Sequence, residues 1–294
     1  MPFSPANEVR TAEATGQEFA SIGSRILSVM LQPLKTARGG RLTTHADRYR
    51  IAAILSLFPL RLGWLLHIFG SDKQKTGEHV YGATYHALMQ SYRYKRIRLL
   101  EIGVLGGASL LAWRAFFPRG TFIGCDIDHK VEFAIGRILT QVTDQSSSSD
   151  LRTLCDQEGP FDIIIDDGSH QNAHQIFTFY EIFDRLAESG LYIIEDVQTS
   201  FWPGYFGGAA VTDRAFLQTC VGEFLELSKY LNHSEFFSRD GLDDRRLTFA
   251  KKIKRIAFEH NLIIIQKGTN DEVSNFKNFA KANLNWRDPA EEPI

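Results

Sequence analysis

Cysteine is scarce in this 294-residue sequence, and the three cysteines, at positions 125, 155 and 220, stand singly. This pattern fits neither a disulfide framework nor a Cys-x-x-Cys metal or redox site. We therefore expect Cys125, Cys155 and Cys220 to be small buried apolar residues in a protein of a reducing, cytoplasmic compartment.

A large excess of charge of one sign is also lacking, because 33 basic residues against 35 acidic ones leave a formal net charge of −2. Such a balance gives no electrostatic reason to expect nucleic acid, and a small-molecule substrate fits better. The length allows one sizeable α/β core with an accessory segment.

Long uninterrupted apolar runs are missing as well. The polar N-terminus lacks the basic-then-apolar layout of a secretory signal. Only Ile51–Gly70 resembles a membrane span, and Pro59, Arg61 and His67 interrupt it. We predict a buried or docking helix pair there and no stable membrane insertion.

The chain divides into three predicted regions. Residues 1–75 read as a helical accessory or oligomerisation region, with helices expected at Glu18–Leu34 and within Tyr49–Phe69. Residues 76–275 form the predicted catalytic domain, and residues 276–294 form a C-terminal tail.

Short apolar runs rich in β-branched residues alternate with helical segments in the catalytic region, which predicts a mostly parallel sheet buried on both faces. The expected strands are Arg96–Gly103, Thr121–Cys125, Phe161–Ile165, Leu191–Ile194 and Leu262–Gln266.

The first expected strand runs into a glycine-rich turn and then a helix, a geometry that offers backbone N–H groups and a helix N-terminus to a nucleotide-type cofactor. The second strand ends in Asp126, where a carboxylate can accept hydrogen bonds from both ribose hydroxyls; Asp128 is the competing choice. The candidate cofactor residues of the turn are Glu101, Gly103, Leu105, Gly107 and Ser109.

A nicotinamide cofactor is the rival interpretation of the same turn and acid. The G-x-G-x-x-G spacing is absent, however, and Glu101 stands two residues before Gly103. This arrangement resembles the acidic-x-Gly turn of class I methyltransferases, in which the acid lies near the amino-acid end of S-adenosylmethionine. The resemblance implies that Asp144 and Gln145 border the adenine, although Leu105 stands where the superfamily often has glycine.

Carboxylates follow two further strands at the edge where open α/β sheets bind ligands. Asp166-Asp167-Gly168-Ser169-His170 ends one strand, and Glu195-Asp196 ends the next. Four like charges so close require a cation, and carboxylates favour a hard ion such as Mg²⁺. The alternative is that these acids cap a helix and begin a loop.

A histidine in such a cluster can act as a base. A metal-bound sugar or catechol hydroxyl has a lowered pKa, and the neutral imidazole of His170 can remove its proton as methyl transfer begins. We expect His174, four residues later, to have a supporting or structural role.

The region Glu101–Gly208 resembles the metal-dependent sugar O-methyltransferases of the mycinamicin and macrocin type. The matching strings are EIGVLGGAS, FFPRG, GPFDIIIDDGSH and GLYIIEDVQTSFWPGYFGG. The resemblance implies Asp167, Glu195 and Asp196 as metal ligands and His170 as the base. It makes Asp166 a neighbour that orients these ligands or touches the cofactor.

The same resemblance implies a Rossmann-like class I methyltransferase fold with a seven-stranded sheet and a homo-oligomeric assembly. The segment from Gly70 to Lys73, followed by His79 and Tyr81, is similar to the family's segment near the cofactor. The likeness fades beyond about residue 209, apart from the final strand and Gln266-Lys267-Gly268. Trp202 and Tyr205 could form an aromatic wall for a sugar ring, or simply a packed turn.

The sequence therefore predicts an S-adenosylmethionine- and divalent-metal-dependent O-methyltransferase that acts on a hydroxyl of a sugar, in a glycosylated natural product or a saccharide. The alternatives are a cephalosporin-hydroxylase-like or NAD-dependent oxidoreductase on the same fold, a catechol-type small-molecule O-methyltransferase, and a non-catalytic scaffold. Binding of NAD but not S-adenosylhomocysteine would favour the oxidoreductase.

Overall fold

The computed structural model describes residues 44–75, 79–129, 132–238 and 240–283, and every structural statement below concerns these ranges. The chain divides into two compact units, residues 1–48 and 49–294. The sheet and the candidate site belong to the second unit.

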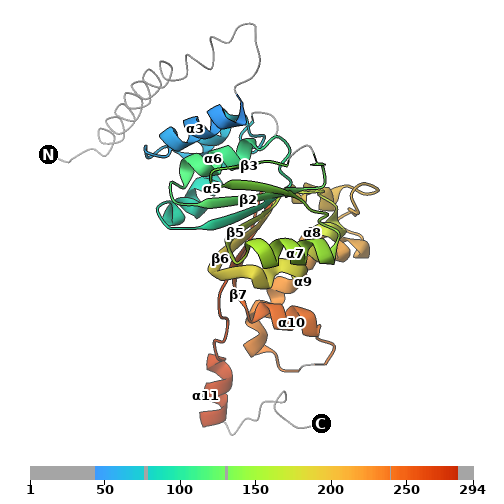
Figure 1. Ribbon diagram of the computed structural model, residues 1–294. Helices are drawn as coiled ribbons and strands as arrows, with labels where there is room; N and C mark the ends of the chain where they lie inside the picture. Colours follow the sequence, from blue (N-terminus) through green and yellow to red (C-terminus); the bar gives the residue numbers. More distant parts are fainter. Residues whose placement is uncertain (1–43, 76–78, 130–131, 239, 284–294) are drawn as a thin grey trace, which may run out of the picture. The chain divides into compact units, whose positions relative to one another are not determined.

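One eight-stranded sheet forms the centre of this unit, in the order β3-β4-β2-β1-β5-β6-β8-β7 (Figure 1). The strands from β4 to β6 are parallel, whereas the pairs β3–β4, β6–β8 and β8–β7 are antiparallel. The strands are β1 (Arg98–Ile102), β2 (Thr121–Asp126), β3 (Ala134–Ile135), β4 (Ile138–Val142), β5 (Phe161–Asp166), β6 (Leu186–Ile194), β7 (Ile253–Glu259) and β8 (Leu262–Lys267).

The predicted Rossmann-like, mostly parallel α/β fold is confirmed, with eight strands instead of seven because the short edge strand β3 is added. All five expected strands are present. Strand β6 begins at Leu186, five residues before the expected start, since Leu186 already pairs with Phe161 of β5.

Helices cover both faces of the sheet: α5 and α6 lie on one face and α7, α8 and α9 on the other (Figure 1). The α-helices are α3 (His45–Leu55), α4 (Leu62–Phe69), α5 (Gly82–Met89), α6 (Ala108–Phe116), α7 (Ser148–Glu158), α8 (Asn172–Ile182), α9 (Cys220–Lys229), α10 (Asp244–Ala250) and α11 (Asn275–Asn283). The 3-10 segments are η1 (Gln90–Tyr92), η3 (Phe183–Arg185), η4 (Val197–Phe201), η5 (Arg214–Gln218) and η6 (Tyr230–Glu235).

The apolar stretch before the sheet forms the expected helix pair, α3 and α4, with Pro59 between them. Helix α4 buries Leu62, Leu65, Leu66 and Phe69, whose spacing places them on one helix face. No helix among the described residues is long and apolar enough to cross a membrane. The expected helix Glu18–Leu34 lies outside the described residues.

Apolar strands explain the burial of the core. Ile163, Ile164 and Ile165 of β5 are fully buried, as a parallel strand covered on both faces requires. Cys125, Cys155 and Cys220 are free and buried, which confirms the prediction that they are apolar core residues.

The order of the strands creates a crevice between β1 and β5. From β1 the chain continues to β2 and β4 on one side, whereas β5 and β6 add on the other. The order in which strands are added thus reverses between β1 and β5. In open α/β sheets, ligands bind beyond the carboxyl ends of the strands at this strand reversal. The turn after β1 and the turn after β5 therefore meet at the candidate site.

Candidate active site

The glycine-rich turn after β1 is built to pass close to its neighbour. Gly103 has a left-handed φ of 85°, and a Cβ there would lie 2.0 Å from the carbonyl oxygen of Asp167. Gly107 (φ 71°) precedes helix α6. Leu105 is 79% exposed and Gly106 has open space where a Cβ would be. The turn thus presents free surface to a ligand.

Asp126 at the end of β2 holds this turn in place. Its Oδ2 accepts hydrogen bonds from the backbone N–H groups of Val104 (2.9 Å) and Leu105 (3.1 Å), and its Oδ1 accepts one from Asp128 (3.1 Å). Each carboxylate oxygen can accept more than one bond. Asp126 therefore shapes the turn, a role that the sequence did not reveal. Its predicted contact with ribose stays a prediction.

Glu101 is buried inside the fold and not on the turn's surface. Its Oε2 accepts hydrogen bonds from Ser109 Oγ (2.7 Å) and Trp113 Nε1 (3.1 Å). Its Oε1 lies 3.2 Å from Lys73 Nζ. Ser109 is also buried. Glu101 and Ser109, both predicted to contact the cofactor, therefore support the turn from inside the fold.

Gln145 and Asp166 brace the loop that carries the histidine. Gln145 donates from Nε2 to Asp166 Oδ1 (2.6 Å), and its Oε1 accepts from the Ser169 N–H (2.9 Å). Burial raises the pKa of Asp166 to about 7. The structure thus gives Asp166 a loop-bracing role, and its predicted cofactor contact stays a prediction.

Asp144, the other residue expected near adenine, lies partly exposed after β4. Its Oδ1 accepts hydrogen bonds from the N–H and the hydroxyl of Ser146, which lower the pKa of Asp144. It is therefore an ionised acceptor at the predicted adenine edge, and its contact with the cofactor stays a prediction.

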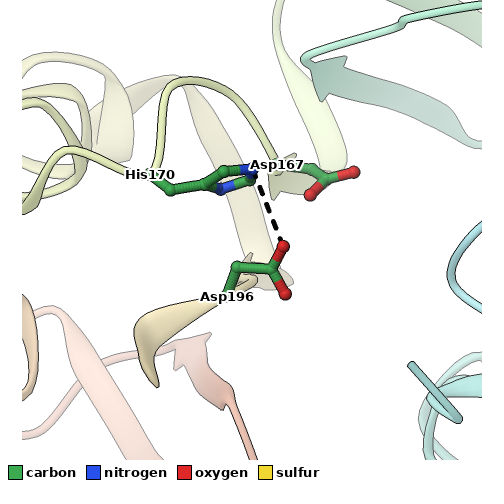
Figure 2. Close-up of side chains that lie close together, drawn as sticks. All are labelled: Asp167, His170 and Asp196. Atoms are coloured by element: carbon green, nitrogen blue, oxygen red, sulfur yellow. Dashed lines mark ion pairs between the residues drawn. The ribbon is translucent and has the colours of Figure 1, made fainter. Parts of the chain in front are cut away.

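Asp167, His170 and Asp196 converge beyond the ends of β5 and β6 (Figure 2). One ligand atom from each side chain lies within 4.8 Å of the others, a spacing that could hold a metal ion. His170 Nε2 lies 3.6 Å from Asp196 Oδ2. The chain thus brings together the predicted base and two of the three predicted metal ligands.

Asp196 is further held by two aromatic residues that precede α5. Tyr81 donates its hydroxyl to Asp196 Oδ1 (2.8 Å), and His79 Nδ1 lies 3.4 Å from the same oxygen. The rings of His79 and Tyr81 stack with centroids 5.0 Å apart. This segment therefore closes one side of the acid cluster.

Glu195 belongs to a deeper part of the cluster. Its Oε1 accepts a hydrogen bond from Tyr85 (2.5 Å) and lies 2.8 Å from Lys73 Nζ. Lys73 also forms an ion pair with Asp167. In the sequence, Lys73 is visible only as part of the family-like segment Gly70–Lys73, and no local pattern marks Tyr85.

The protonation of these groups follows from burial and charge. Burial alone lowers the pKa of Lys73, but its contacts with Asp167, Glu195 and Glu101 outweigh this and hold that pKa well above its usual value. Burial raises the pKa of Asp167 and of Glu195, against the opposing effect of Lys73. One ammonium is thus too little positive charge for the cluster.

His170 is suited to accept a proton. Burial lowers its pKa, while Asp196 acts in the opposite direction, so the imidazole is neutral near pH 7. Its Nδ1 is buried without a hydrogen-bond partner among the described residues. His174 instead contacts Ser169 Oγ through Nδ1 (2.9 Å), in keeping with the supporting role expected of it.

The loop after β6 presents the two aromatic residues expected at the acceptor side. Trp202 is 45% and Tyr205 69% exposed. Asn172, the buried first residue of α8, donates its N–H (3.0 Å) and its Nδ2 (2.8 Å) to the carbonyl of Phe206. The loop is thus tied to the helix that follows His170.

Backbone strain gathers at these same turns. A non-glycine residue with positive φ is uncommon, and bulky ones are outliers that mark ligand sites and switch regions. Among the described residues, six non-glycine residues have a positive φ, and four of these lie in the turns and loops around the candidate site. These four are Leu105 (φ 48°), His170 (φ 55°), Asp196 (φ 56°) and Phe206 (φ 51°).

The parallel sheet, the acidic-x-Gly turn and the acid cluster at the strand reversal define a Rossmann-like methyltransferase. Residues 100–197 match the family model described as a methyltransferase domain. These residues belong to this domain family, and the curated relatives of the chain are named as O-methyltransferases.

Two curated O-methyltransferases are similar to this chain over about 200 residues. The 8-demethyl-8-alpha-L-rhamnosyl tetracenomycin-C 2'-O-methyltransferase of Streptomyces olivaceus is 39% identical over 208 residues, covering 68% of this chain and 53% of that protein. The demethylmacrocin O-methyltransferase of Streptomyces fradiae is 38% identical over 202 residues, covering 66% and 50%. The chain spans about half the length of these relatives.

A solved structure shares the fold. The MycE methyltransferase of the mycinamycin biosynthetic pathway, in complex with Mg, SAH and mycinamycin VI, has a TM-score of 0.63 and 33% sequence identity. The match covers 73% of this chain and 56% of that one.

Proposed function

We propose that this protein is an S-adenosylmethionine- and divalent-metal-dependent O-methyltransferase that methylates a hydroxyl of a sugar, in a glycosylated natural product or a saccharide. The observation that carries the proposal is the convergence of Asp167, His170 and Asp196 at the strand reversal. The relatives support it, since one related structure holds Mg, SAH and mycinamycin VI together.

The cofactor would lie against the turn after β1. The exposed backbone around Leu105 and Gly106 leaves room there, and Gly103 allows the turn to approach the loop that begins at Asp167. Asp126 would receive the ribose, and Asp144 with Gln145 would border the adenine. Because Glu101 is buried, it would act on the amino-acid end through its charge and its support of the turn.

The donor set fits a hard divalent cation such as Mg²⁺. Asp167 and Asp196 would hold it, with Glu195 as the third ligand, because carboxylate oxygens suit such an ion. The carboxylates of Asp167, Asp196, Glu195 and Glu101 share the one ammonium of Lys73, which pairs with three of them, so three formal negative charges remain. A divalent ion and the sulfonium of S-adenosylmethionine would supply three positive charges.

The bound ion would lower the pKa of an acceptor hydroxyl, so that the hydroxyl loses its proton near neutral pH. His170 would take this proton as the methyl group leaves the sulfonium sulfur and bonds to the hydroxyl oxygen, with S-adenosylhomocysteine as the second product. Asp196, 3.6 Å from the imidazole, would stabilise the imidazolium that results. The transfer needs no covalent enzyme intermediate, so positioning carries the remaining catalysis.

The acceptor would rest on the loop after β6. Trp202 and Tyr205 expose aromatic faces suited to the apolar side of a sugar ring. The ties between Asn172 and Phe206 would keep this surface at a fixed distance from the base.

The test is methyl transfer from labelled S-adenosylmethionine to a panel of deoxysugar glycosides, free sugars and catechols. We expect label in a glycoside or sugar, loss of turnover with a chelator, and recovery with Mg²⁺. Activity that survives thorough metal removal would reject the metal, and label only in catechols would reject the sugar. Calorimetry with S-adenosylhomocysteine and NAD separates the oxidoreductase.

We also propose a cytoplasmic homo-oligomer that binds no nucleic acid, in which residues 1–75 assist assembly and residues 276–294 form a tail. The net charge of −2 gives no reason to expect nucleic acid, and the three free cysteines fit a reducing compartment. The family likeness and the apolar region Ile51–Phe69 support self-association. Light scattering of the purified chain tests it, and a monomer at micromolar concentration would contradict it.

A further inference from the structure

Lys73 is a buried cation inside the acid cluster. Its side chain is 2% exposed, although a lysine is almost never fully buried unless it is paired. It belongs to the segment before α5 and is distant in sequence from every acid that it meets. Its burial is therefore explained by its partners.

The three partners come from three neighbouring strands. Glu101 lies near the end of β1, Asp167 directly follows β5, and Glu195 directly follows β6. Lysine carries three N–H donors and no acceptor, so one ammonium can serve all three carboxylates. Lys73 thus links the cofactor side of the crevice to the metal side.

Two of these partners are also proposed ligands of the divalent ion. Asp167 and Glu195 face Lys73 directly, while Asp167 also belongs to the group with His170 and Asp196. A positive charge beside shared carboxylates repels a second cation, and the repulsion is strong where water is excluded. Without Lys73 the same carboxylates would attract a divalent ion more strongly.

We propose that Lys73 is a resident cation of the acid cluster that positions Asp167 and Glu195 and weakens the binding of the divalent ion by sharing them. The inference rests on the proposed metal-dependent function. Lys73 holds the carboxylates of Asp167 and Glu195 close together before the ion binds. Because it weakens binding, the bound ion can dissociate and exchange with ions in solution. It is a positioning residue, because it acts through the ligands and not on the acceptor.

The test measures Mn²⁺ binding by electron paramagnetic resonance at pH 8, without cofactor or acceptor. Lys73→Met removes the ammonium, and we expect its dissociation constant to fall about tenfold or more. Lys73→Arg keeps the charge and should bind within about threefold of the unaltered protein. Lys252→Met, which removes a partly exposed ammonium paired with Asp184 outside the acid cluster, is the matched control and should also stay within about threefold.

A second pair of variants covers the case in which Lys73→Met does not fold. Glu101→Gln removes one buried carboxylate charge, so the double variant Lys73→Met/Glu101→Gln keeps the formal balance of the cluster. We expect the double variant to bind Mn²⁺ more tightly than Glu101→Gln alone, while circular dichroism shows both folded.

Equal or weaker binding by the folded variants that lack Lys73 would overturn the inference. Absence of Mn²⁺ binding in the unaltered protein would instead overturn the proposed metal site. A purely structural Lys73 would lower thermal stability without tightening metal binding, so the direction of the affinity change separates the two roles.

Discussion

Two halves of the acid cluster differ in environment although they touch. The inner group, Lys73, Glu101 and Glu195, is at most 2% exposed. The outer group, Asp167, His170 and Asp196, is between 13% and 29% exposed. The comparison teaches that Lys73 offsets part of the negative charge of the inner group within the fold, whereas the outer side chains remain accessible to a ligand.

Glu195 and Asp196 show how adjacent residues reach different halves. The N–H of Glu195 donates to the Asp166 carbonyl (2.9 Å) and so extends the pairing of β6 with β5. Asp196 then adopts a left-handed φ of 56°, which ends the strand direction and begins η4. One backbone turn therefore separates a buried acid from an accessible one.

The largest effect is expected in the outer group. His170→Ala should lower turnover by about 10²- to 10⁴-fold, because it removes the proposed general base. Thermal stability and S-adenosylhomocysteine affinity should change little, since the side chain is partly exposed and lies outside the proposed cofactor surface.

The control is His174→Ala, four residues away and bonded to Ser169. Single-turnover kinetics of both variants should show the loss in His170→Ala only. Equal losses would remove His170 as the base.

Substitutions in the inner group should lower the free energy of unfolding more than substitutions in the outer group. Glu195→Ala leaves the buried Tyr85 hydroxyl without its acceptor and removes one of the three carboxylates around Lys73, which should cost about 3 kcal/mol of unfolding free energy. Asp196→Ala should cost about 1 kcal/mol, because solvent reaches the groups that it leaves. Urea unfolding measures both, and similar costs would mean that the two halves are not distinct.

The tyrosine hydroxyls offer a smaller version of the same contrast. Tyr85→Phe removes a hydrogen bond to the buried Glu195, and we expect a loss of about 1.5–3 kcal/mol. Tyr81→Phe removes one to Asp196, which keeps its contacts with His79 and His170, so we expect about 1 kcal/mol. A larger loss in Tyr81→Phe than in Tyr85→Phe would reverse the comparison.

The smallest effect concerns pH. His170 must be neutral to take a proton, and burial lowers its pKa below the usual 6.5. Activity should therefore decline only as pH falls through that lowered value, and at pH 6.5 it should exceed half of its value at pH 8. A midpoint above 6.5 in the rate profile would show that Asp196 outweighs burial.

The sequence predicted what depends on local pattern. The strands follow from apolar runs, and Asp167, His170 and Asp196 could be grouped because the ends of parallel strands share one edge. The glycine turn was likewise visible, since only glycine fits the approach of Gly103 to Asp167.

Long-range contacts could not be predicted in the same way. Lys73 meets Asp167 across 94 positions and Tyr85 meets Glu195 across 110, and no period or spacing links such residues. From the sequence, a bound metal was therefore the only expected source of positive charge for the carboxylates. In the fold, the ammonium of Lys73 supplies one positive charge. Asp126 shows the same limit, because its bonds to Val104 and Leu105 depend on how β1 and β2 align.

Asn172 has a consequence for engineering. Its backbone and side chain both hold the Phe206 carbonyl, while its Oδ1 accepts bonds from Ser200 Oγ and the Cys220 N–H. A loop transplanted from a relative without these contacts would detach from the helix that follows the base. If the loop carries the acceptor as proposed, an exchange of acceptor preference therefore calls for grafting the loop together with residues 170–172.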